Sequence, residues 1–395
     1  MEKRFSLKFV ITLVLITSAS VCLLLSLLFL WQINSTPGKS SDTDGFSELL
    51  DIISTRYIGT YDVDDLSDTA MRAAVDSLDD QWSFYMSPGE YADYLESSNN
   101  RYTGIGVEVL MDEEAGGIKV MGVYPDSGAD AAGITAGDII TAVDGESIRD
   151  LTLVEIRALL RRPINDTVLL TVLRENGEYQ ELTVVYSVVF TDPVSYEMVS
   201  STVGYIVIRN FETGAADGFI NAVNALIEQG AEGFIYDVRS NNGGKVTEMT
   251  QILDFLLPEG EIFISVDRSG KEEITLSDAG FIDLPAVVLI NRHSYSAAEY
   301  FTAMLSEYGY AQAVGEQTTG KNRMQTTIPM SGGGAVHIST GEYLTKNRVS
   351  LYDTGGFTPD FLITLSDDEL AIFRPGVLDT ATDTQFKMAL SLLKD

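Results

Sequence analysis

Residues 203–244 read VGYIVIRNFETGAADGFINAVNALIEQGAEGFIYDVRSNNGG, and their pattern predicts the architecture of the C-terminal half. Residues 203–211 and 233–238 are short apolar runs, as expected for buried strands. The segment between them, 215–230, repeats its apolar residues at helical spacing. Strands and helices in this alternating order predict an α/β core whose strands are mostly buried.

The alternation of strands and helices continues toward the C-terminus. Helical spacing recurs over 245–257 and 297–309, and the run AVVLI at 286–290 between them reads as a further buried strand. Three later strands are expected at 326–330, 335–340 and 341–345, and a closing helix at 384–393.

The N-terminal half changes its pattern near Asn99. From 45 to 96 the apolar spacing is helical, and Ser87-Pro88 starts a short helix. After Asn99, apolar and polar residues alternate between Gly and Asp turns, which is typical of strands. Strands are expected at 103–111, 117–125, 137–145 and 166–176, and one helix among them at 151–160. The chain is therefore predicted to be α/β overall, as a mixed α+β multidomain protein.

An apolar run near the N-terminus predicts a membrane anchor. The run from Phe9 to Trp31 has 23 residues, which is enough to cross a bilayer as a helix. Three basic residues precede it, and positive charge stays on the cytoplasmic side, so the rest of the chain is expected outside a single span of the cell membrane. A cleaved signal peptide is the competing interpretation, but its apolar core is usually shorter, and no clean small-residue site precedes Ser35.

Composition excludes several classes of function. The chain has 58 acidic and 26 basic residues, a net charge of −32, and no basic stripe that would displace counterions from nucleic acid. Its single cysteine, Cys22, excludes an intramolecular disulfide and a cysteine metal cluster. Neither a metal nor a cofactor is predicted.

The domain boundaries are expected where the pattern changes. A length of 395 residues predicts two or three folded domains. In order, we expect a cytoplasmic tail (1–8), an anchor (9–31), a polar tether (32–44), a helical region (45–98), a strand-rich domain (99–188), an α/β core (189–375) and a C-terminal helix (376–395).

Ser296 is the main candidate for a nucleophile. It lies in NRHSYSAAEYF, between the strand ending at Ile290 and the helix starting near Ala297. A serine in such a turn lies at a helix N-terminus, where unpaired N–H groups favour developing negative charge. The residues also fit the capping box S-x-x-E with Glu299, so an ordinary helix cap is the alternative. Ser294 is a second candidate.

Lys321 is the candidate general base, in GEQTTGKNRMQ. The chain has only two histidines, His293 and His337, and a lysine with a lowered pKa can serve as a base instead. Lys321 also completes the phosphate-loop spacing G-x4-G-K, but Asn322 stands where Ser or Thr would hold Mg²⁺, and a strand is expected to follow. An exposed surface lysine is the remaining alternative.

The loop DVRSNNGG at 237–244 also leaves a buried strand and opens a helix. Gly243 and Gly244 allow the backbone to come close to a ligand, and their N–H groups are candidate donors to an oxyanion. A glycine-rich turn with an asparagine cap is the alternative.

The strand-rich domain resembles a PDZ domain. Residues 127–148, SGADAAGITAGDIITAVDGESI, carry the AGI-x-x-GD-x-I-x-x-V-(D/N)-G pattern of bacterial PDZ modules. The resemblance implies a loop whose backbone N–H groups receive the terminal carboxylate of a peptide, namely Thr103, Gly104, Ile105 and Gly106. The peptide would add as a strand beside the helix 151–160. A tight turn without a binding role is the alternative for these glycines.

Taken in order, the segments resemble the carboxyl-terminal processing peptidases, a family of Ser–Lys proteases, over about residues 45–365. The shared segments are SLDDQWSFYMSPGEYADY, the PDZ pattern, DVRSNNGG, SYSAAE, GK with a glutamine four positions later, and GEYLT followed by GFTPDF. The resemblance implies that Ser296, three positions before Glu299, is the nucleophile and that Ser294 is not. The implied base is Lys321, with Gln325 as its supporting residue. The implied oxyanion donors are a backbone N–H in the Gly243-Gly244 loop and that of Ala297.

The family resemblance also implies a crotonase-like protease core and an endopeptidase that acts on proteins or peptides with free C-termini. Substrates attached to the membrane or secreted are expected, and a second copy of the chain is a further candidate partner. The lysine must be neutral, which requires burial and no close carboxylate.

This sequence departs from the family pattern without losing a catalytic group. Asn242 precedes the glycines, Asn322 follows the lysine, SYSAA replaces SASAS, and KNR replaces a P-x-G turn near residue 346. A catalytically weak PDZ scaffold on a protease fold is the alternative, although it would predict loss of Ser296, Lys321 or the double glycine. A crotonase-like acyl-transfer enzyme is a third hypothesis, which the PDZ insertion and the anchor disfavour.

Overall fold

The computed structural model describes residues 41–393, so the predicted anchor at 9–31 lies outside the described residues. The chain divides into two compact units, one ending at Ser67 and the other beginning at Asp68. In the first unit, helix α2 (Ser41–Arg56) begins within the range predicted as a tether. Helix α3 (Val63–Asp76) spans the division. Within the described part of the chain, no helix has the length and apolar character needed to cross a bilayer.

The strand-rich domain of the second unit is built on an antiparallel sheet in the order β3-β4-β5-β7-β8, with β6 paired to β5. Its strands are β3 (Val107–Asp112), β4 (Gly117–Val123), β5 (Ile139–Val143), β6 (Glu146–Ser147), β7 (Thr167–Leu173) and β8 (Tyr179–Val185). The helices are α5 (Gly128–Ala131) and α6 (Leu153–Leu159). Because β3 ends the sheet, one of its edges is free of any partner strand among the described residues.

The strand predicted at 103–111 is two strands. Strand β2 (Arg101–Gly104) pairs with β9 (Ser187–Phe190), and β3 begins only after Ile105-Gly106. Gly106 has a φ of 87°, a conformation that glycine adopts without strain, and a Cβ there would lie 2.1 Å from Ser127 Cβ. The glycine therefore breaks the strand that the alternating pattern suggested.

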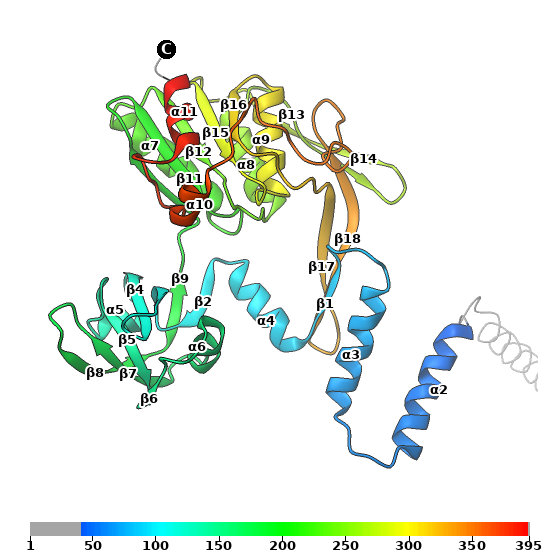
Figure 1. Ribbon diagram of the computed structural model, residues 1–395. Coiled ribbons are helices and arrows are strands. Elements are labelled where there is room, and N and C mark those ends of the chain that lie inside the picture. Colours follow the sequence, from blue (N-terminus) through cyan, green and yellow to red (C-terminus); the bar gives the residue numbers. More distant parts are fainter. Residues whose placement is uncertain (1–40, 394–395) are drawn as a thin grey trace, which may run out of the picture. The chain divides into compact units, whose positions relative to one another are not determined.

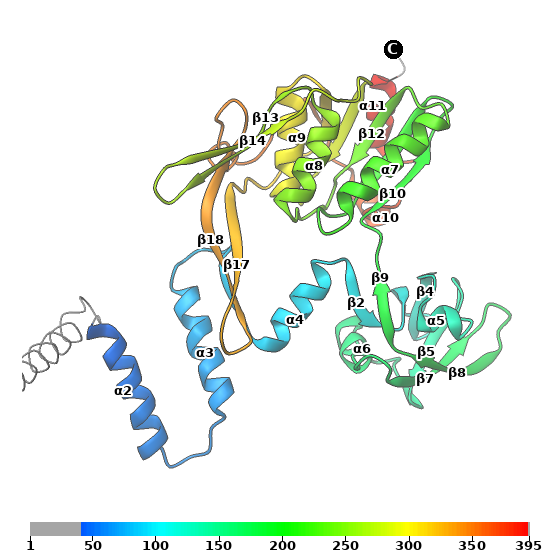
Figure 2. The ribbon, with the colours of Figure 1, turned by 180° about the vertical axis from the view of Figure 1, so that it is seen from behind.

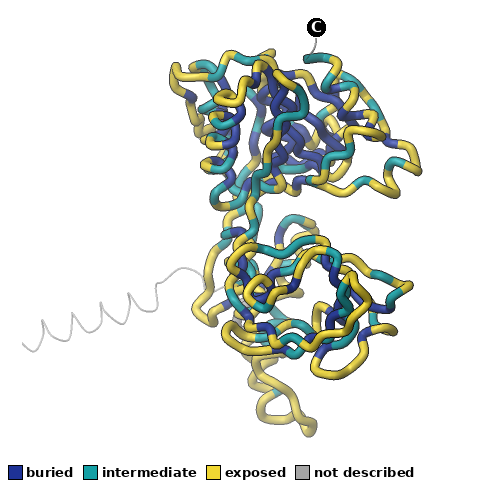
Figure 3. Tube along the Cα trace, turned by 90° about the vertical axis from the view of Figure 1, so that its left-hand side faces the viewer, coloured by how far each residue is buried: buried dark blue, intermediate teal, exposed yellow. Residues whose placement is uncertain are grey.

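A six-stranded sheet in the order β10-β11-β12-β15-β16-β19 forms the centre of the C-terminal core (Figure 1). Neighbouring strands are parallel, except that β10 pairs antiparallel with β11. The strands are β10 (Val194–Met198), β11 (Val203–Ile208), β12 (Gly233–Asp237), β15 (Ala286–Ile290), β16 (Ala311–Gly315) and β19 (Phe361–Leu362). Every residue of β11, β12 and β15 is buried (Figure 3), as expected for parallel strands covered on both faces.

Helices cover the two faces of this sheet. One face packs against α7 (Ala215–Glu228), α8 (Val246–Leu256) and α9 (Ala297–Glu307), and the other against α11 (Thr384–Leu392), as Figure 2 shows from behind. Alternate residues of one strand point to opposite faces of the sheet. Ile206 of β11 belongs to the core between the sheet and helices α7, α8 and α9, and Tyr205 belongs to the core on the face that α11 covers. The helices predicted at 215–230, 245–257, 297–309 and 384–393 are thus confirmed.

A second sheet carries one wall of the site described below. Its strands are β1 (Phe84–Met86), β13 (Gly260–Asp267), β14 (Glu272–Ser277), β17 (Arg323–Pro329) and β18 (Ala335–Leu344). The two strands predicted at 335–340 and 341–345 are the single strand β18, and the β13/β14 hairpin was not predicted. Its strand β14 is almost entirely exposed and lacks a clear apolar alternation. Helix α4 (Pro88–Ser97) begins at the predicted Ser87-Pro88.

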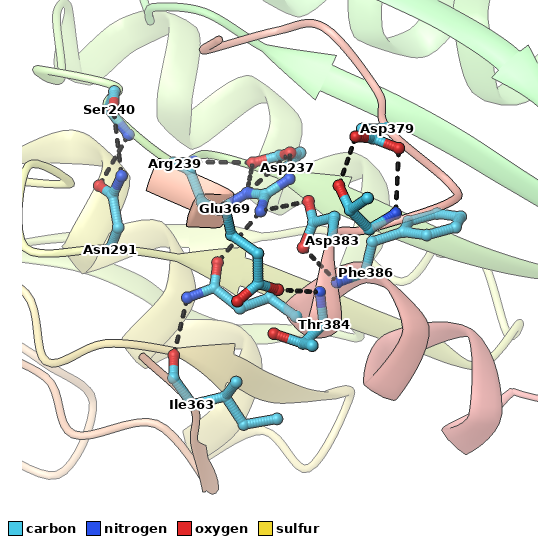
Figure 4. A network of polar contacts seen from close by, with 12 residues as sticks. Asp237, Arg239, Ser240, Asn291, Ile363, Glu369, Asp379, Asp383, Thr384 and Phe386 are labelled. Atoms are coloured by element: carbon cyan, nitrogen blue, oxygen red, sulfur yellow. Dashed lines mark hydrogen bonds and ion pairs between the residues drawn. The ribbon is translucent and has the colours of Figure 1, made fainter. Parts of the chain in front are cut away.

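A buried ion-pair network joins α11 to the end of β12 (Figure 4). The Arg239 guanidinium donates to both carboxylate oxygens of Asp237 and, at 2.7 Å, to Asp383 Oδ2. Asp383 also caps α11 by accepting the Phe386 N–H at 2.9 Å. Tyr205 Oη donates to Asp237 Oδ2 at 2.6 Å, and Gln385 Oε1 accepts from Arg239 at 3.1 Å. The buried charges are therefore paired, which fixes the last helix against the sheet.

Candidate active site

Ser296 lies in the turn between β15 and α9 in a strained backbone conformation. Its φ of 58° and ψ of −123° are rare for a residue other than glycine. The Ser296 N–H donates to Glu299 Oε1 at 3.3 Å, as in a capping box. The Ser296 hydroxyl stands at the helix N-terminus within hydrogen-bond reach of the Tyr343 hydroxyl, so its surroundings include more than the helix cap.

Ser294 has a structural role instead. It is fully buried, its hydroxyl donates to the Val238 carbonyl at 2.8 Å, and it accepts the Asn291 N–H at 3.1 Å. These bonds tie the turn after β15 to the end of β12, so the Ser294 hydroxyl has no access to a substrate.

The double-glycine loop lies directly beside the Ser296 turn. Gly243 has a φ of 91°, and a Cβ at this position would lie 2.8 Å from Ser296 Cβ. The Gly243 N–H is already bonded to Asn241 Oδ1 at 2.8 Å, whereas the N–H groups of Gly244 and Ala297 donate no hydrogen bond to any residue in 41–393. Of the predicted oxyanion donors, Gly244 and Ala297 therefore remain available.

Asn241, to which the sequence analysis gave no such role, holds this loop in place. Its Nδ2 donates to the Ile208 carbonyl at 2.7 Å, and its carbonyl accepts the Tyr295 N–H at 3.1 Å. One residue thus connects strand β11, the glycine loop and the turn that carries Ser296. Its signal in the sequence was only an asparagine before glycines, which is also a common turn pattern.

Lys321 lies in the loop between β16 and β17 and is only 8% exposed, so it is not a surface lysine. Buried Glu299 organises this loop by accepting the Thr318 Oγ1–H at 2.7 Å, the Gly320 N–H at 2.8 Å and the Lys321 N–H at 2.5 Å. A strand follows the lysine, which rules out a phosphate loop there. Burial lowers the pKa of Lys321 to about 8, and the charges of Glu299 and Asp80 only partly oppose this effect.

Trp82 covers the lysine. Lys321 Nζ lies 4.5 Å from the centroid of the Trp82 ring, and that ring lies 5.7 Å from the ring of Tyr295. Asp80 anchors the segment by accepting from Ser83 Oγ at 2.6 Å and by pairing with Arg323 at 3.1 Å. The contact between Trp82 and Lys321 joins residues far apart in the chain, so no local sequence pattern indicates it.

Gln325 makes no hydrogen bond to Lys321 in the described part of the chain. Its Nε2 donates to the Arg323 carbonyl at 3.1 Å and to Ser339 Oγ at 3.0 Å. Among residues 41–393, no hydrogen bond joins the side chains of Ser296 and Lys321. The two residues therefore belong to one site without a formed proton-transfer contact.

The two histidines differ in position. His293 is exposed and does not line the site. His337 stacks on Phe84, and its Nδ1 lies 2.8 Å from Thr327 Oγ1. Burial and the Lys321 charge lower the pKa of His337 to about 4, so its imidazole is neutral at physiological pH.

A cleft of about 580 Å³ brings the separate segments together. Its lining includes Ser296, Lys321, Gln325, Gly244, Trp82 and His337. A serine hydroxyl, two N–H groups without an acceptor among residues 41–393, and a buried lysine of lowered pKa are the groups that attack on a carbonyl requires.

The predicted carboxylate loop of the strand-rich domain is partly occupied by the chain itself. Glu96 accepts both the Thr103 N–H and the Thr103 hydroxyl at 3.1 Å, and Gly104 belongs to the paired strand β2. The N–H groups of Ile105 and Gly106 donate no hydrogen bond in the part of the chain that the structure describes. Two of the four predicted donors are thus left.

Comparison with known proteins agrees with this architecture. Residues 202–363 match the model of peptidase family S41, and residues 119–174 match that of the PDZ domain. The carboxyl-terminal-processing protease of Synechocystis is 29% identical over 331 residues, 82% of this chain and 76% of the relative. The chloroplastic carboxyl-terminal-processing peptidase 1 of Arabidopsis thaliana is 31% identical over 297 residues, 72% of this chain and 60% of the relative.

A solved structure extends the likeness to the fold. An S41 protease of Bacteroides fragilis, 18% identical, superposes with a TM-score of 0.59 and covers 86% of this chain and 92% of its own. Fold and site together define a serine-type peptidase that carries a PDZ domain. The chain thus carries a peptidase S41 domain and a PDZ domain, and it is similar over most of its length to carboxyl-terminal processing proteases.

Proposed function

We propose that this peptidase is a membrane-anchored extracytoplasmic endopeptidase in which Ser296 is the nucleophile and Lys321 the general base. The observation that carries the proposal is a buried lysine in the same cleft as a serine at a helix N-terminus, and burial lowers the pKa of that lysine to about 8. Neutral Lys321 takes the Ser296 proton as Oγ bonds to the peptide carbonyl carbon, and gives it to the amine that leaves when the C–N bond breaks. Water, deprotonated by Lys321, then hydrolyses the ester on Ser296, which releases the acid product and restores the serine. The N–H groups of Gly244 and Ala297 receive the oxyanion, each contributing about 3 kcal/mol.

Substrate binding completes the catalytic arrangement in this proposal. Catalytic hydrogen bonds are often long before the substrate arrives and shorten in the complex. Gln325 supports the lysine once its amide leaves Ser339 Oγ and turns toward Nζ. A neutral amide suits this role, because a carboxylate at the same position would raise the pKa of Lys321.

The proposal is tested with an unfolded protein or a peptide with an apolar C-terminus as substrate. Ser296→Ala and Lys321→Ala should each abolish cleavage while the circular dichroism spectrum stays unchanged. Lys271→Ala is the matched control, because it removes a lysine whose side chain is 65% exposed on the β13/β14 hairpin. Undiminished cleavage by Lys321→Ala would rule out the Ser–Lys pair.

Selection of substrates by their C-termini is part of the proposal. The edge of β3 has no partner strand in the described chain, and the adjacent N–H groups of Ile105 and Gly106 are available there to donate to a carboxylate. The natural substrates are then proteins with accessible C-termini, either secreted or attached to the outer face of the membrane.

Anchoring by residues 9–31 rests on the sequence pattern alone. The full chain should sediment with membranes and resist extraction at alkaline pH, and protease added to intact cells should digest its folded part. A chain found intact in the medium with a new N-terminus near residue 35 would instead identify a cleaved signal peptide.

A further inference from the structure

Glu212 is a carboxylate in the cleft that the proposed mechanism does not use. It follows β11 and precedes α7, and it lines the same cleft as Ser296 and Lys321. Its Oε2 atom is buried and has no hydrogen-bond partner among the described residues. Buried polar atoms in folded proteins are nearly always paired, because an unpaired one costs free energy. The unpaired oxygen belongs to a residue of the cleft wall and therefore points to a donor that arrives with a ligand.

The neighbouring charged groups do not satisfy Glu212. The Lys245 ammonium donates to Thr213 Oγ1, and Glu248 Oε2 accepts the Ala216 N–H at 2.9 Å. Burial, and then the Glu248 charge, raise the pKa of Glu212 to about 7 against the attraction of Lys245. The other titratable groups of the cleft lining are Lys321, Arg323, His337, Tyr94, Tyr295 and Tyr343.

We propose that Glu212 is a specificity-determining residue that binds a basic side chain of the substrate, lysine or arginine, near the scissile bond. An ammonium or guanidinium supplies both the counter-charge and the N–H donors that Oε2 lacks. The inference rests on the proposed function, because it takes this cleft as the place where the substrate chain lies. The preference for a basic residue should strengthen as pH rises above 7, where Glu212 is ionised.

The test uses a peptide that the wild-type enzyme cleaves. Lysine replaces each residue around the scissile bond in turn, and each lysine peptide is paired with its acetyl-lysine counterpart, which keeps the shape and loses the charge. At pH 8.5, one position should show a kcat/KM at least about tenfold higher for lysine, as expected for a charge-assisted hydrogen bond.

Three variants connect this ratio to the carboxylate. Glu212→Gln should bring the ratio to about one, and Glu212→Lys should favour a glutamate peptide over its glutamine counterpart. Glu228→Gln is the matched control, because it removes one negative charge from an exposed position on α7 outside the cleft and should leave the ratio unchanged.

Two outcomes would overturn the inference. One is an unchanged lysine to acetyl-lysine ratio in Glu212→Gln while cleavage persists. The other needs no variant: a wild-type ratio that is the same at pH 6 and pH 8.5 contradicts a carboxylate that titrates near 7. Failure of the wild-type enzyme to cleave any peptide would contradict the proposed function instead.

Discussion

Burial gives Lys321 the neutral form that the proposed base requires. A base must be neutral to accept a proton, whereas a lysine side chain in water is charged up to a pKa above 10. The cleft disfavours the ammonium form by removing water, and it leaves Glu299 close enough to hold the loop through its backbone. Glu299 thus organises the lysine loop through N–H groups rather than through an ion pair with Nζ.

The pH dependence of cleavage should follow Lys321. Because the proposed base is the neutral amine, kcat/KM should rise as pH passes through about 8 and level off above it. His337 should add no step between pH 5 and 7, because its pKa lies near 4. A pH series with one peptide measures this, and a maximum near pH 5 would exclude a lysine base.

The same burial should oppose folding. The pKa of Lys321 falls from 10.5 to about 8, and one pKa unit corresponds to about 1.4 kcal/mol, so the cost is about 3 kcal/mol when both states are protonated. This cost is complete below pH 8 and disappears as pH rises from 8 to 10.5. Lys321→Met should therefore raise the free energy of unfolding at pH 7 and raise it much less at pH 10.

Denaturant titrations at the two pH values measure this gain in stability. Lys271→Met is the control, because the exposed Lys271 side chain keeps its hydration in the folded state. An equal gain in Lys321→Met at both pH values would mean that packing, and not the buried charge, stabilises the variant.

The segment before β1 should set the basicity of the lysine. Trp82 excludes water from Nζ, which lowers the pKa of Lys321, and its ring also attracts the ammonium, which raises it. Burial is the largest cause of the observed lowering, so Trp82→Ala should raise the pKa and move the pH profile of kcat/KM upward. Trp82→Phe should keep most of the wild-type profile. A profile moved downward by Trp82→Ala would show that the ring attraction dominates.

The attachment of α11 should depend on Arg239. Arg239→Met would leave Asp237 and Asp383 buried without their cation, and we expect a loss of about 3–5 kcal/mol in the free energy of unfolding. Arg348→Met, which breaks partly exposed pairs with Glu261 and Glu272, should cost less than about 1 kcal/mol for each pair. Chemical denaturation compares the two, and similar losses would contradict the importance of burial.

For the molecule as a whole, the PDZ domain predicts a dependence on the substrate terminus. A peptide with a free carboxylate should be cleaved more efficiently than its C-terminal amide, by about tenfold in kcat/KM, because a carboxylate makes stronger hydrogen bonds to Ile105 and Gly106. Steady-state kinetics with the two peptides measures the ratio. Equal kcat/KM values for the two peptides would show that the PDZ loop takes no part in substrate selection.

Local patterns in the sequence sufficed for most of the fold and for part of the site. The parallel strands and the helices over them have strong periodicity, and the Ser296 turn follows from a strand, a serine and a helix in succession. The roles of Trp82, Asn241 and Glu212 depend on contacts between distant segments, which no local pattern contains. The exposed strand β14 and the break at Gly106 also lack a periodic signal.

The network around Arg239 has a consequence for proteolytic trimming of the enzyme. Its partners Asp383 and Gln385 lie at the start of the helix that covers one face of the central sheet. A cut between β19 and α11 would release that helix and leave the Arg239 guanidinium without two of its three acceptor residues. Such a cut should therefore destabilise the core that carries the site, rather than yield a shorter stable peptidase.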